Sequence, residues 1–400
     1  MKQLLINLLF VISFVMLICS CGKDDLNTQS SEGDNSKSAE GYTIKLLSKT
    51  LTEKGYLDKN IYYKILSETS QTATITQCNN VSEEIKIPQY IVIDDTKKYT
   101  ITTIGAGAFS DCKQLKSIII PSSITKIGAG AFSECKKLES VYIYDLSAWC
   151  DIDFDFYGDY GSNPLIYAQS LFIKGEEGID LVVPQNVTNI KNRAFVNYQK
   201  LKSIHIPNSV QTIGTEAFLY CTGLTSVSLS NNLISLEGGA FSYCGQLNSI
   251  IIPNSVTKIG NAAFAFCGNL KSVVIGNNVK TIGSNAFESN GLTSISIPNS
   301  VQDIGWWAFA GCSHLKRVVI GDNVKTIGSN AFEGCSILED VYCLANTVPK
   351  ATNNEYTGHA FNNCNLGTLH VPSKSMDAYR HTYPWNLFNS IVAIKDNEEF

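Results

Sequence analysis

The amino-acid sequence predicts an α/β repeat solenoid, in which short coils of parallel β-strand and helical or 3-10 turn stack on one another. One motif, Ile-Pro-Asn-Ser-Val-x-x-Ile-Gly-x-x-Ala-Phe-x-x-Cys-x-x-Leu-x-Ser-Ile, recurs with little variation from about residue 101 to residue 345. Most copies are 23 residues apart, so a single unit is too small to bury its own apolar face and must stack on its neighbours. Each copy contains an Ala-Phe pair, whose phenylalanines are Phe109, Phe132, Phe195, Phe218, Phe241, Phe264, Phe287, Phe309, Phe332 and Phe361.

The composition limits the possible classes of function. The formal net charge is -5, and the Lys and Arg residues are scattered, which argues against a nucleic-acid partner because such proteins carry a basic stripe. The sequence contains no Gly-x-Ser-x-Gly elbow, phosphate loop or His-Glu-x-x-His motif. We therefore expect neither enzymatic activity nor a bound cofactor.

Residues 1–20 predict a lipoprotein signal peptide. A nearly unbroken apolar run covers residues 4–18, which is short for a membrane span but suits a signal-peptide core. The following Ile-Cys-Ser-Cys resembles a bacterial lipobox, so we expect acyl chains on Cys21 to anchor the protein to a membrane; the alternative is an ordinary secretory signal. The next residues, Lys-Asp-Asp, resemble the signal that directs Bacteroidetes lipoproteins to the surface. The expected location is the outer membrane, facing outward.

Four segments follow the signal peptide. Residues 21–40 contain few apolar side chains and predict a disordered tether. Residues 41–100 alternate apolar and polar positions, which indicates a β-rich cap over the core of the first coil. The solenoid covers residues 101–365 with an insertion around 145–180, and residues 366–400 are expected to form a small α/β C-terminal cap.

The pattern within a coil assigns a direction to each side chain. In the copy that begins at residue 201, segment 201–206 is a short strand with its apolar side chains inward. Val210 and Ile213 pack inward after a Pro-Asn-Ser turn. The Ala-Phe pair is expected to form a single helical or 3-10 turn that places the Phe218 ring in the core.

The repeated motif resembles the leucine-rich repeat of the BspA-like class over about three quarters of the chain. The insert DLSAWC at residues 145–150, which ends in SNPL at residues 162–165, also resembles an insert found in such proteins. This class is common in surface proteins of Bacteroidetes, spirochaetes and some protists. The resemblance implies a leucine-rich repeat fold and an association with adhesion to host extracellular-matrix proteins and to other bacteria.

Eight of the 13 cysteines share one repeat position. An exported protein could use them as disulfides, but equivalent positions in adjacent coils have parallel Cβ vectors about 4.8 Å apart, whereas a disulfide needs about 3.8 Å. Tyr198 and Asn290 also interrupt the series without a paired loss. We therefore expect buried free thiols that pack as small apolar groups, at Cys112, Cys135, Cys221, Cys244, Cys267, Cys312, Cys335 and Cys364.

Two features outside the predicted sheet are candidate sites. Asp151, Asp153 and Asp155 stand two residues apart and form a calcium candidate, although the glycine and glutamate of an EF-hand are missing; the alternative is a solvated acidic edge. The other feature is the pair that replaces the small residues before one Ala-Phe, Trp306 and Trp307. Trp307 is the candidate that could stack on a sugar or fill a partner's pocket, and plain packing is the alternative.

The outward side chains of the sheet form the expected ligand surface. One uncharged row includes four anchor candidates, Tyr142, His205, Tyr342 and His370. The leading hypothesis is a cell-surface protein whose sheet face binds a protein ligand, such as a host-matrix protein. The alternatives are a glycan-binding lipoprotein that uses Trp307 or the insert, and a structural surface component in which β-branched residues simply favour a sheet. The row comprises Ile119, Tyr142, His205, Ser228, Ile251, Val274, Ser296, Val319, Tyr342 and His370.

Overall fold

The computed structural model describes residues 39–48, 51–52, 54–79, 82–155, 160–352 and 358–395, all within one compact unit, residues 36–400. The predicted signal peptide, Cys21 and most of the predicted tether lie outside these residues. Among the helices of the described ranges, none is both long enough and apolar enough to cross a bilayer.

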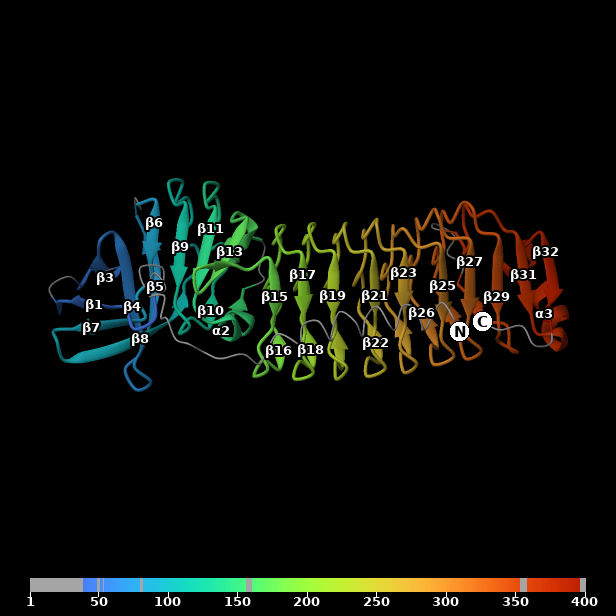
Figure 1. Ribbon diagram of the computed structural model, residues 1–400, viewed down its shortest axis with the longest axis horizontal. Helices are drawn as coiled ribbons and strands as arrows, with labels where there is room; N and C mark the ends of the chain where they lie inside the picture. The colour runs from blue at the N-terminus through green and yellow to red at the C-terminus, as the bar shows by residue number, and fades with distance from the viewer. Residues whose placement is uncertain are drawn as a thin grey trace, which may run out of the picture. The chain divides into compact units, whose positions relative to one another are not determined.

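The first strands build a mixed sheet at the N-terminal end of the solenoid (Figure 1). Its strand order is β1-β7-β8-β5-β4-β3-β2. The short strands β10 and β12 continue this sheet in parallel from β8, which joins it to the first coils. The strands are β1 (Thr43–Leu46), β2 (Leu51–Thr52), β3 (Gly55–Asp58), β4 (Ile61–Ser67), β5 (Thr72–Cys78), β7 (Tyr90–Ile93), β8 (Lys97–Ile104), β10 (Lys126–Ile127) and β12 (Asp153–Phe154).

A longer strand from each coil forms the first side of the solenoid, called here the sheet face. These strands pair in parallel with equivalent residues opposite one another, for example Ser203 with Ser226. Figure 1 shows them side by side from β6 to β32. They are β6 (Glu84–Lys86), β9 (Ser117–Ile120), β11 (Ser140–Ile143), β13 (Ser170–Ile173), β15 (Asp180–Val182), β17 (Ser203–His205), β19 (Ser226–Ser228), β21 (Ser249–Ile251), β23 (Ser272–Val274), β25 (Ser294–Ile297), β27 (Arg317–Ile320), β29 (Asp340–Cys343), β31 (Thr368–Val371) and β32 (Ser390–Ala393).

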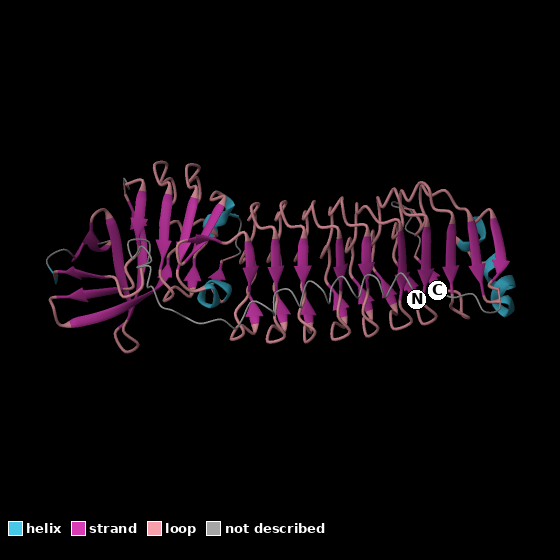
Figure 2. Ribbon diagram, viewed as in Figure 1, coloured by secondary structure: helices cyan, strands magenta, loops and turns pink. Residues whose placement is uncertain are grey.

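A two-residue strand from each coil forms the second side, the short-strand face. From β16 to β30 these strands make one continuous parallel sheet, visible as the lower row of arrows in Figure 2. The sheet comprises β16 (Asn189–Ile190), β18 (Thr212–Ile213), β20 (Ser235–Leu236), β22 (Lys258–Ile259), β24 (Thr281–Ile282), β26 (Asp303–Ile304), β28 (Thr326–Ile327) and β30 (Lys350–Ala351).

The Ala-Phe segment forms the third side, the turn face. The expected turn is present as single hydrogen-bonded turns within each coil, which do not continue into a helix. The backbone N–H of Phe218 donates to the Ala240 carbonyl of the next coil, and the N–H of Tyr220 donates to that of Ser242. The intervening Leu219 N–H donates within its own coil, to Glu216. Alternating bonds of these two kinds satisfy the backbone without a helix and tie each coil to the next.

The core lies between the three faces. The side chains predicted to point inward in the 201–218 coil are at most 2% exposed. The Ala-Phe rings stack on one another in successive coils with centroids 4.9 to 5.6 Å apart. All cysteines in the described ranges are free thiols, as expected; seven of the eight at the repeat position are buried, but Cys364 is only half-buried. The Cys221 Sγ donates to the Phe195 carbonyl of the preceding coil at 3.1 Å.

The insertion interrupts this regular core between Phe132 and Phe195. It contains α2 (Leu146–Cys150), η3 (Tyr160–Ser162), η4 (Pro164–Ile166) and the short strand β14 (Glu176–Glu177), which pairs antiparallel with β13. The Trp149 ring is buried in the core, and its Nε1 donates to the Ala194 carbonyl at 2.9 Å. The insertion therefore supplies its own core aromatic residue in place of an Ala-Phe pair.

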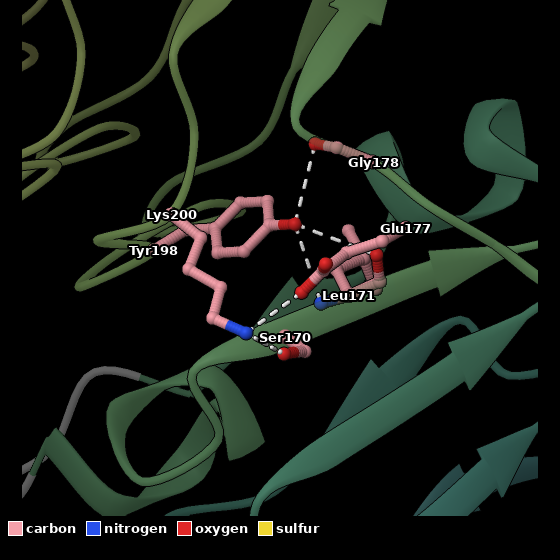
Figure 3. A network of polar contacts seen from close by, with 6 residues as sticks. All are labelled: Ser170, Leu171, Glu177, Gly178, Tyr198 and Lys200. Carbon is pink, nitrogen blue, oxygen red and sulfur yellow. Dashed lines mark hydrogen bonds and ion pairs between the residues drawn. The ribbon is translucent and has the colours of Figure 1, made fainter.

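Tyr198 occupies the cysteine position of the coil that follows the insertion, and Figure 3 shows why a larger side chain is needed there. Its hydroxyl accepts from the Leu171 N–H at 3.3 Å and donates to the Gly178 carbonyl at 3.2 Å. Beside it, Lys200 Nζ lies 2.8 Å from Ser170 Oγ and 2.9 Å from a Glu177 carboxylate oxygen. These contacts join the β13–β14 hairpin to the next coil.

The C-terminal end closes the core with η5 (Ser373–Ser375), α3 (Met376–His381) and η6 (Trp385–Leu387) before β32. The Trp385 and Phe388 rings meet the last Ala-Phe ring, Phe361, edge-on at 5.3 and 5.2 Å. Trp385 Nε1 donates to the Pro349 carbonyl at 3.0 Å, so the buried indole has its polar group satisfied.

Candidate functional site

The strand register places the uncharged row on the sheet face and adds two residues to it. Tyr142 lies opposite Phe172 of β13, and His205 lies opposite Val182 of β15. The repeat pattern does not predict Phe172 and Val182, because the insertion removes the Ala-Phe pair that marks the other copies.

Aromatic pairs occupy the row on both sides of its middle part. The Tyr142 and Phe172 rings stack with centroids 4.7 Å apart, and the Tyr342 and His370 rings stack at 4.0 Å. The Arg317 guanidinium lies 4.4 Å from the Tyr342 ring centroid. Tyr342 is consequently only 6% exposed, and its predicted role as an exposed anchor is wrong.

His370 also contacts a neighbour through its polar edge. Its Nε2 lies 2.8 Å from Asp340 Oδ1, and both residues belong to adjacent strands of the sheet face. His370 is half-buried, whereas the fourth predicted anchor, His205, is exposed. Of the four predicted anchors, only His205 is exposed. Tyr142 and His370 are half-buried, and Tyr342 is buried.

The exposed part of the row lies on six adjacent strands, β15 to β25. We call it the central stripe; it comprises Val182, His205, Ser228, Ile251, Val274 and Ser296, all exposed. Its three aliphatic members are 53 to 62% exposed. Two aliphatic residues outside the stripe that were expected to be exposed, Ile119 and Val319, are buried.

A row of serines runs beside the central stripe, two residues earlier in each strand. These residues are Ser203, Ser226, Ser249, Ser272 and Ser294. Because serine is short, this row does not shield the aliphatic side chains of the stripe. Asp180 of β15 lies in the same row, opposite Ser203, and is charged. Further charge lies one position nearer the preceding turn, at Lys202 and Lys271.

The tryptophan pair has the opposite arrangement to the one that the sequence suggested. Trp306 is exposed, and Trp307 is half-buried with its Nε1 donating to Glu333 at 3.1 Å. The two rings meet edge-on with centroids 6.2 Å apart. Trp307, the candidate chosen from the sequence, is thus held by a carboxylate of a neighbouring coil and is not an open stacking platform.

The three aspartates of the insertion do not gather around one point. Asp151 pairs with Lys191 at 3.5 Å, and Asp153 lies exposed on β12. Within the described residues, which exclude 156–159, no group of three His, Cys, Asp or Glu side chains is arranged to hold a metal ion. The calcium candidate at Asp151, Asp153 and Asp155 is therefore not assembled by the residues that the structure describes.

Two of the buried thiols, Cys150 and Cys312, are poor nucleophiles. Burial raises the pKa of Cys150 and of Cys312 to about 12, because a thiolate is poorly solvated in an apolar core. A reactive cysteine requires the opposite shift and partial exposure. These two side chains therefore act as small apolar groups.

A second exposed feature, which was not predicted from the sequence, lies on the turn face. Tyr220, Tyr243 and Phe266 stack in a row with centroids 4.6 Å apart at both steps, and each is 37 to 38% exposed. We call this row the aromatic ladder. All three have a left-handed backbone, with φ of 60 to 61°. Equivalent residues in other coils share that backbone but are polar or glycine: Asp111, Glu134, Asn197, Ser289, Gly311, Gly334 and Asn363.

The backbone of the aromatic ladder is strained. A left-handed backbone costs a bulky residue about 1–2 kcal/mol, which glycine and asparagine largely avoid. Each stacked ring pair returns about 0.5–1.5 kcal/mol beyond its buried area. The ladder has three strained residues and only two ring pairs, so the ring-pair contribution taken alone is smaller than the strain.

The aromatic ladder coincides with the least charged part of the chain. From Ala217 to Leu270 the only charged residues are Glu237 and Lys258. This stretch also contains the middle of the central stripe. An alignment of the repeat copies by charge and by side-chain size would have revealed the aromatic ladder, because the varying position two residues after each Ala-Phe pair is where it lies.

Comparison with solved structures supports the fold. A leucine-rich repeat protein from Bacteroides ovatus is 25% identical, with 85% of this chain and 100% of that chain covered and a TM-score of 0.51. One from Eubacterium ventriosum is 23% identical over 84% and 83% of the two chains, with a TM-score of 0.44. The pneumococcal vaccine antigen PcpA is 19% identical over 85% and 98%, with a TM-score of 0.48. No curated protein matches the chain.

The repeat itself gives the most specific similarity. The family described as "BspA type Leucine rich repeat region" matches in six copies over residues 89–149, 169–291 and 263–386, which is more than half of the chain. The sequence resemblance is thereby confirmed, and so is the solenoid of parallel strands. The chain belongs to the BspA-type leucine-rich repeat family.

Proposed function

We propose that this protein is a lipid-anchored cell-surface receptor that binds a protein ligand through the central stripe of its sheet face. Membership of a leucine-rich repeat family of the surface type agrees with a binding scaffold rather than an enzyme. The observation that carries the proposal is the alignment of exposed aliphatic side chains, Val182, Ile251 and Val274, on one uncharged row.

Size and charge both favour a protein ligand on this face. Six strands at about 4.8 Å spacing span roughly 25 Å, which is the scale of one side of a standard protein interface. Interface centres are depleted of charge, and the lysines beside the stripe sit where a polar rim would lie. The exposed stretch available to the ligand lies between two stacked pairs, Tyr142–Phe172 and Tyr342–His370.

The experiment compares two isoleucines of equal exposure on different faces. Ile251 lies in the central stripe, and Ile234 directly precedes β20 of the short-strand face. Each is 56% exposed. The full-length protein and the variants Ile251→Asp and Ile234→Asp are tested by surface plasmon resonance against purified extracellular-matrix proteins, at low and at high salt.

Ile251→Asp introduces a carboxylate that the bound ligand would cover. We expect it to weaken binding about tenfold or more, because an unpaired charge at an interface is costly to desolvate. Ile234→Asp is expected to bind like the wild type, and high salt is expected to have little effect since the stripe is uncharged. Equal affinities for all three proteins would contradict the proposed surface.

The lipid anchor is tested separately. The lipobox-like sequence around Cys21 and the apolar run over 4–18 support acylation and outer-membrane attachment. Cys21→Ala is expected to move the protein from the membrane fraction to the soluble fraction. Digestion of intact cells with an external protease is expected to remove the protein if it faces outward, and protection of the chain would contradict surface exposure.

A further inference from the structure

The aromatic ladder lies on a different face from the central stripe and needs its own explanation. Tyr220, Tyr243 and Phe266 occupy a backbone position that favours glycine or asparagine, and other coils place polar residues or glycine there. Their rings are partly exposed and stack on one another along the row. Strained backbone held at an exposed side chain is characteristic of functional positions.

The area of the aromatic ladder limits what it can bind. A large aromatic side chain offers about 150–250 Å² of surface, so three rings that are each over a third exposed present roughly 200–300 Å² in total. A stable contact with a second copy of this chain needs about 800 Å² from each partner. The ladder is therefore suited to a small or narrow ligand.

The surroundings of the aromatic ladder are polar but uncharged. Thr222, Gln246 and Asn269 follow the three aromatic residues closely in sequence and are exposed. They offer hydroxyl and amide groups, which both donate and accept hydrogen bonds. Glu237 and Lys258 are the only charges between residues 217 and 270. The carboxylates that flank this stretch, Glu216 and Glu288, accept hydrogen bonds from Arg193 and Asn285.

Open space adjoins the rings. A Cβ atom added at Gly245 or Gly268, each two residues after a ring of the ladder, would meet nothing within 4 Å. The row also ends in small polar residues, Asn197 on one side and Ser289 on the other, so the outer ring faces are not stacked on further aromatic residues of the row. Aromatic faces with hydrogen-bonding groups beside them suit a ligand that has C–H and hydroxyl groups on the same unit.

We propose that the aromatic ladder is a second binding site, specific for a neutral oligosaccharide chain that lies along the row of rings. Sugar C–H groups would pack on Tyr220, Tyr243 and Phe266, and sugar hydroxyls would bond to the amide and hydroxyl side chains beside them. This site is independent of the protein-binding proposal, because it uses other residues on another face.

The test uses a substitution that the repeat already accepts. Asparagine occurs at the equivalent positions Asn197 and Asn363, so the triple variant Tyr220→Asn, Tyr243→Asn, Phe266→Asn removes the rings without adding strain. The stripe variant is Val182→Asn, Ile251→Asn, Val274→Asn. Full-length wild type, the ladder variant and the stripe variant are run in native gels that contain dextran, galactomannan or mixed-linkage β-glucan. Heparin and polygalacturonate serve as charged controls, and affinities for oligosaccharides follow by calorimetry.

We expect at least one neutral polysaccharide to retard the wild type and the stripe variant, and the ladder variant to bind about tenfold or more weakly. The melting temperature of the ladder variant is expected not to fall. The proposal is overturned if no neutral polysaccharide retards the wild type, if only the charged ones do, or if the ladder variant binds as well. A large fall in the melting temperature would also overturn it by showing that the rings are structural, and so would loss of a protein ligand in the ladder variant alone.

Discussion

The imidazole ring of His370 lies parallel to the phenol ring of Tyr342, with their centroids 4.0 Å apart. The Arg317 guanidinium contacts the same phenol ring, and Asp340 bonds to the edge of the imidazole. Four side chains from three adjacent strands are thus partners of one another. This part of the sheet face stabilises the last coils and does not offer free anchors to a ligand.

Tyr342→Ala should therefore reduce stability strongly. The ring is almost fully buried, and truncating a buried aromatic side chain typically costs about 3–5 kcal/mol. Urea unfolding followed by circular dichroism measures the change. His205→Ala on the same row is the control, and it should change the free energy of unfolding by less than about 0.5 kcal/mol because His205 is exposed. Equal effects of the two changes would show that Tyr342 is not held as described.

The stacked core explains a second contrast on the turn face. The Phe241 ring lies between the rings of Phe218 and Phe264, at 4.9 and 5.5 Å. Phe241→Ala should lower the free energy of unfolding by about 3–5 kcal/mol. Tyr243→Asn, only two residues away on the exposed aromatic ladder, should lower it little or not at all because asparagine accepts the left-handed backbone. Thermal melts of both variants measure this, and a matched loss in both would contradict the distinction between core and ladder.

The repeat made the fold predictable from the sequence, but not the surface. Core positions such as Phe218 recur every 23 residues, and a periodic pattern reveals positions that all copies share. The burial of Tyr342 depends instead on Arg317 in the preceding coil and on His370 in the following one, which no single copy contains. Phe172 was missed because the insertion hides its coil. The aromatic ladder was missed because its position varies between copies.

Contacts between coils also explain why the turn in the Ala-Phe segment does not continue into a helix. Its sequence is compatible with one turn of helix, since nothing within a single copy disfavours it. The bonds that decide its conformation run to the next coil, for example from the Phe218 N–H to the Ala240 carbonyl. Information about such bonds lies in the stacking of the coils and not in the local sequence.

Tyr198 should be essential for joining the insertion to the solenoid. Tyr198→Phe removes the hydroxyl that bonds to the Leu171 N–H and the Gly178 carbonyl, and leaving buried backbone groups unpaired costs about 1–3 kcal/mol. Hydrogen exchange should accelerate at the Leu171 amide and in the 170–178 hairpin. Lys200→Met is the control for the exposed polar contacts beside it, and it should have a smaller effect. Unchanged exchange at Leu171 in the Phe variant would refute this role.

The buried thiols predict how stability depends on pH. Burial raises the pKa of Cys312 to about 12 in the folded protein, whereas a thiol in an unfolded chain has a pKa of about 8.5. Between these values the unfolded state has lost the proton and the folded state keeps it. The unfolded state therefore binds fewer protons, and stability falls as pH rises through this window. Below about pH 8 the thiol is neutral in both states and has no pH-dependent effect.

Cys312→Ala should make the decrease in stability with rising pH less steep. One thiol contributes about 1.4 kcal/mol per pH unit when its unfolded form is fully ionised, so the variant and wild type should converge in stability between about pH 9 and pH 11. Urea unfolding in the presence of a reductant at pH 7, 9 and 10 measures the difference. The reductant itself should not change the midpoint at pH 7, because the cysteines of the described coils are free thiols. Parallel pH profiles for the two proteins would mean that Cys312 ionises in the folded state and is not buried as a neutral thiol.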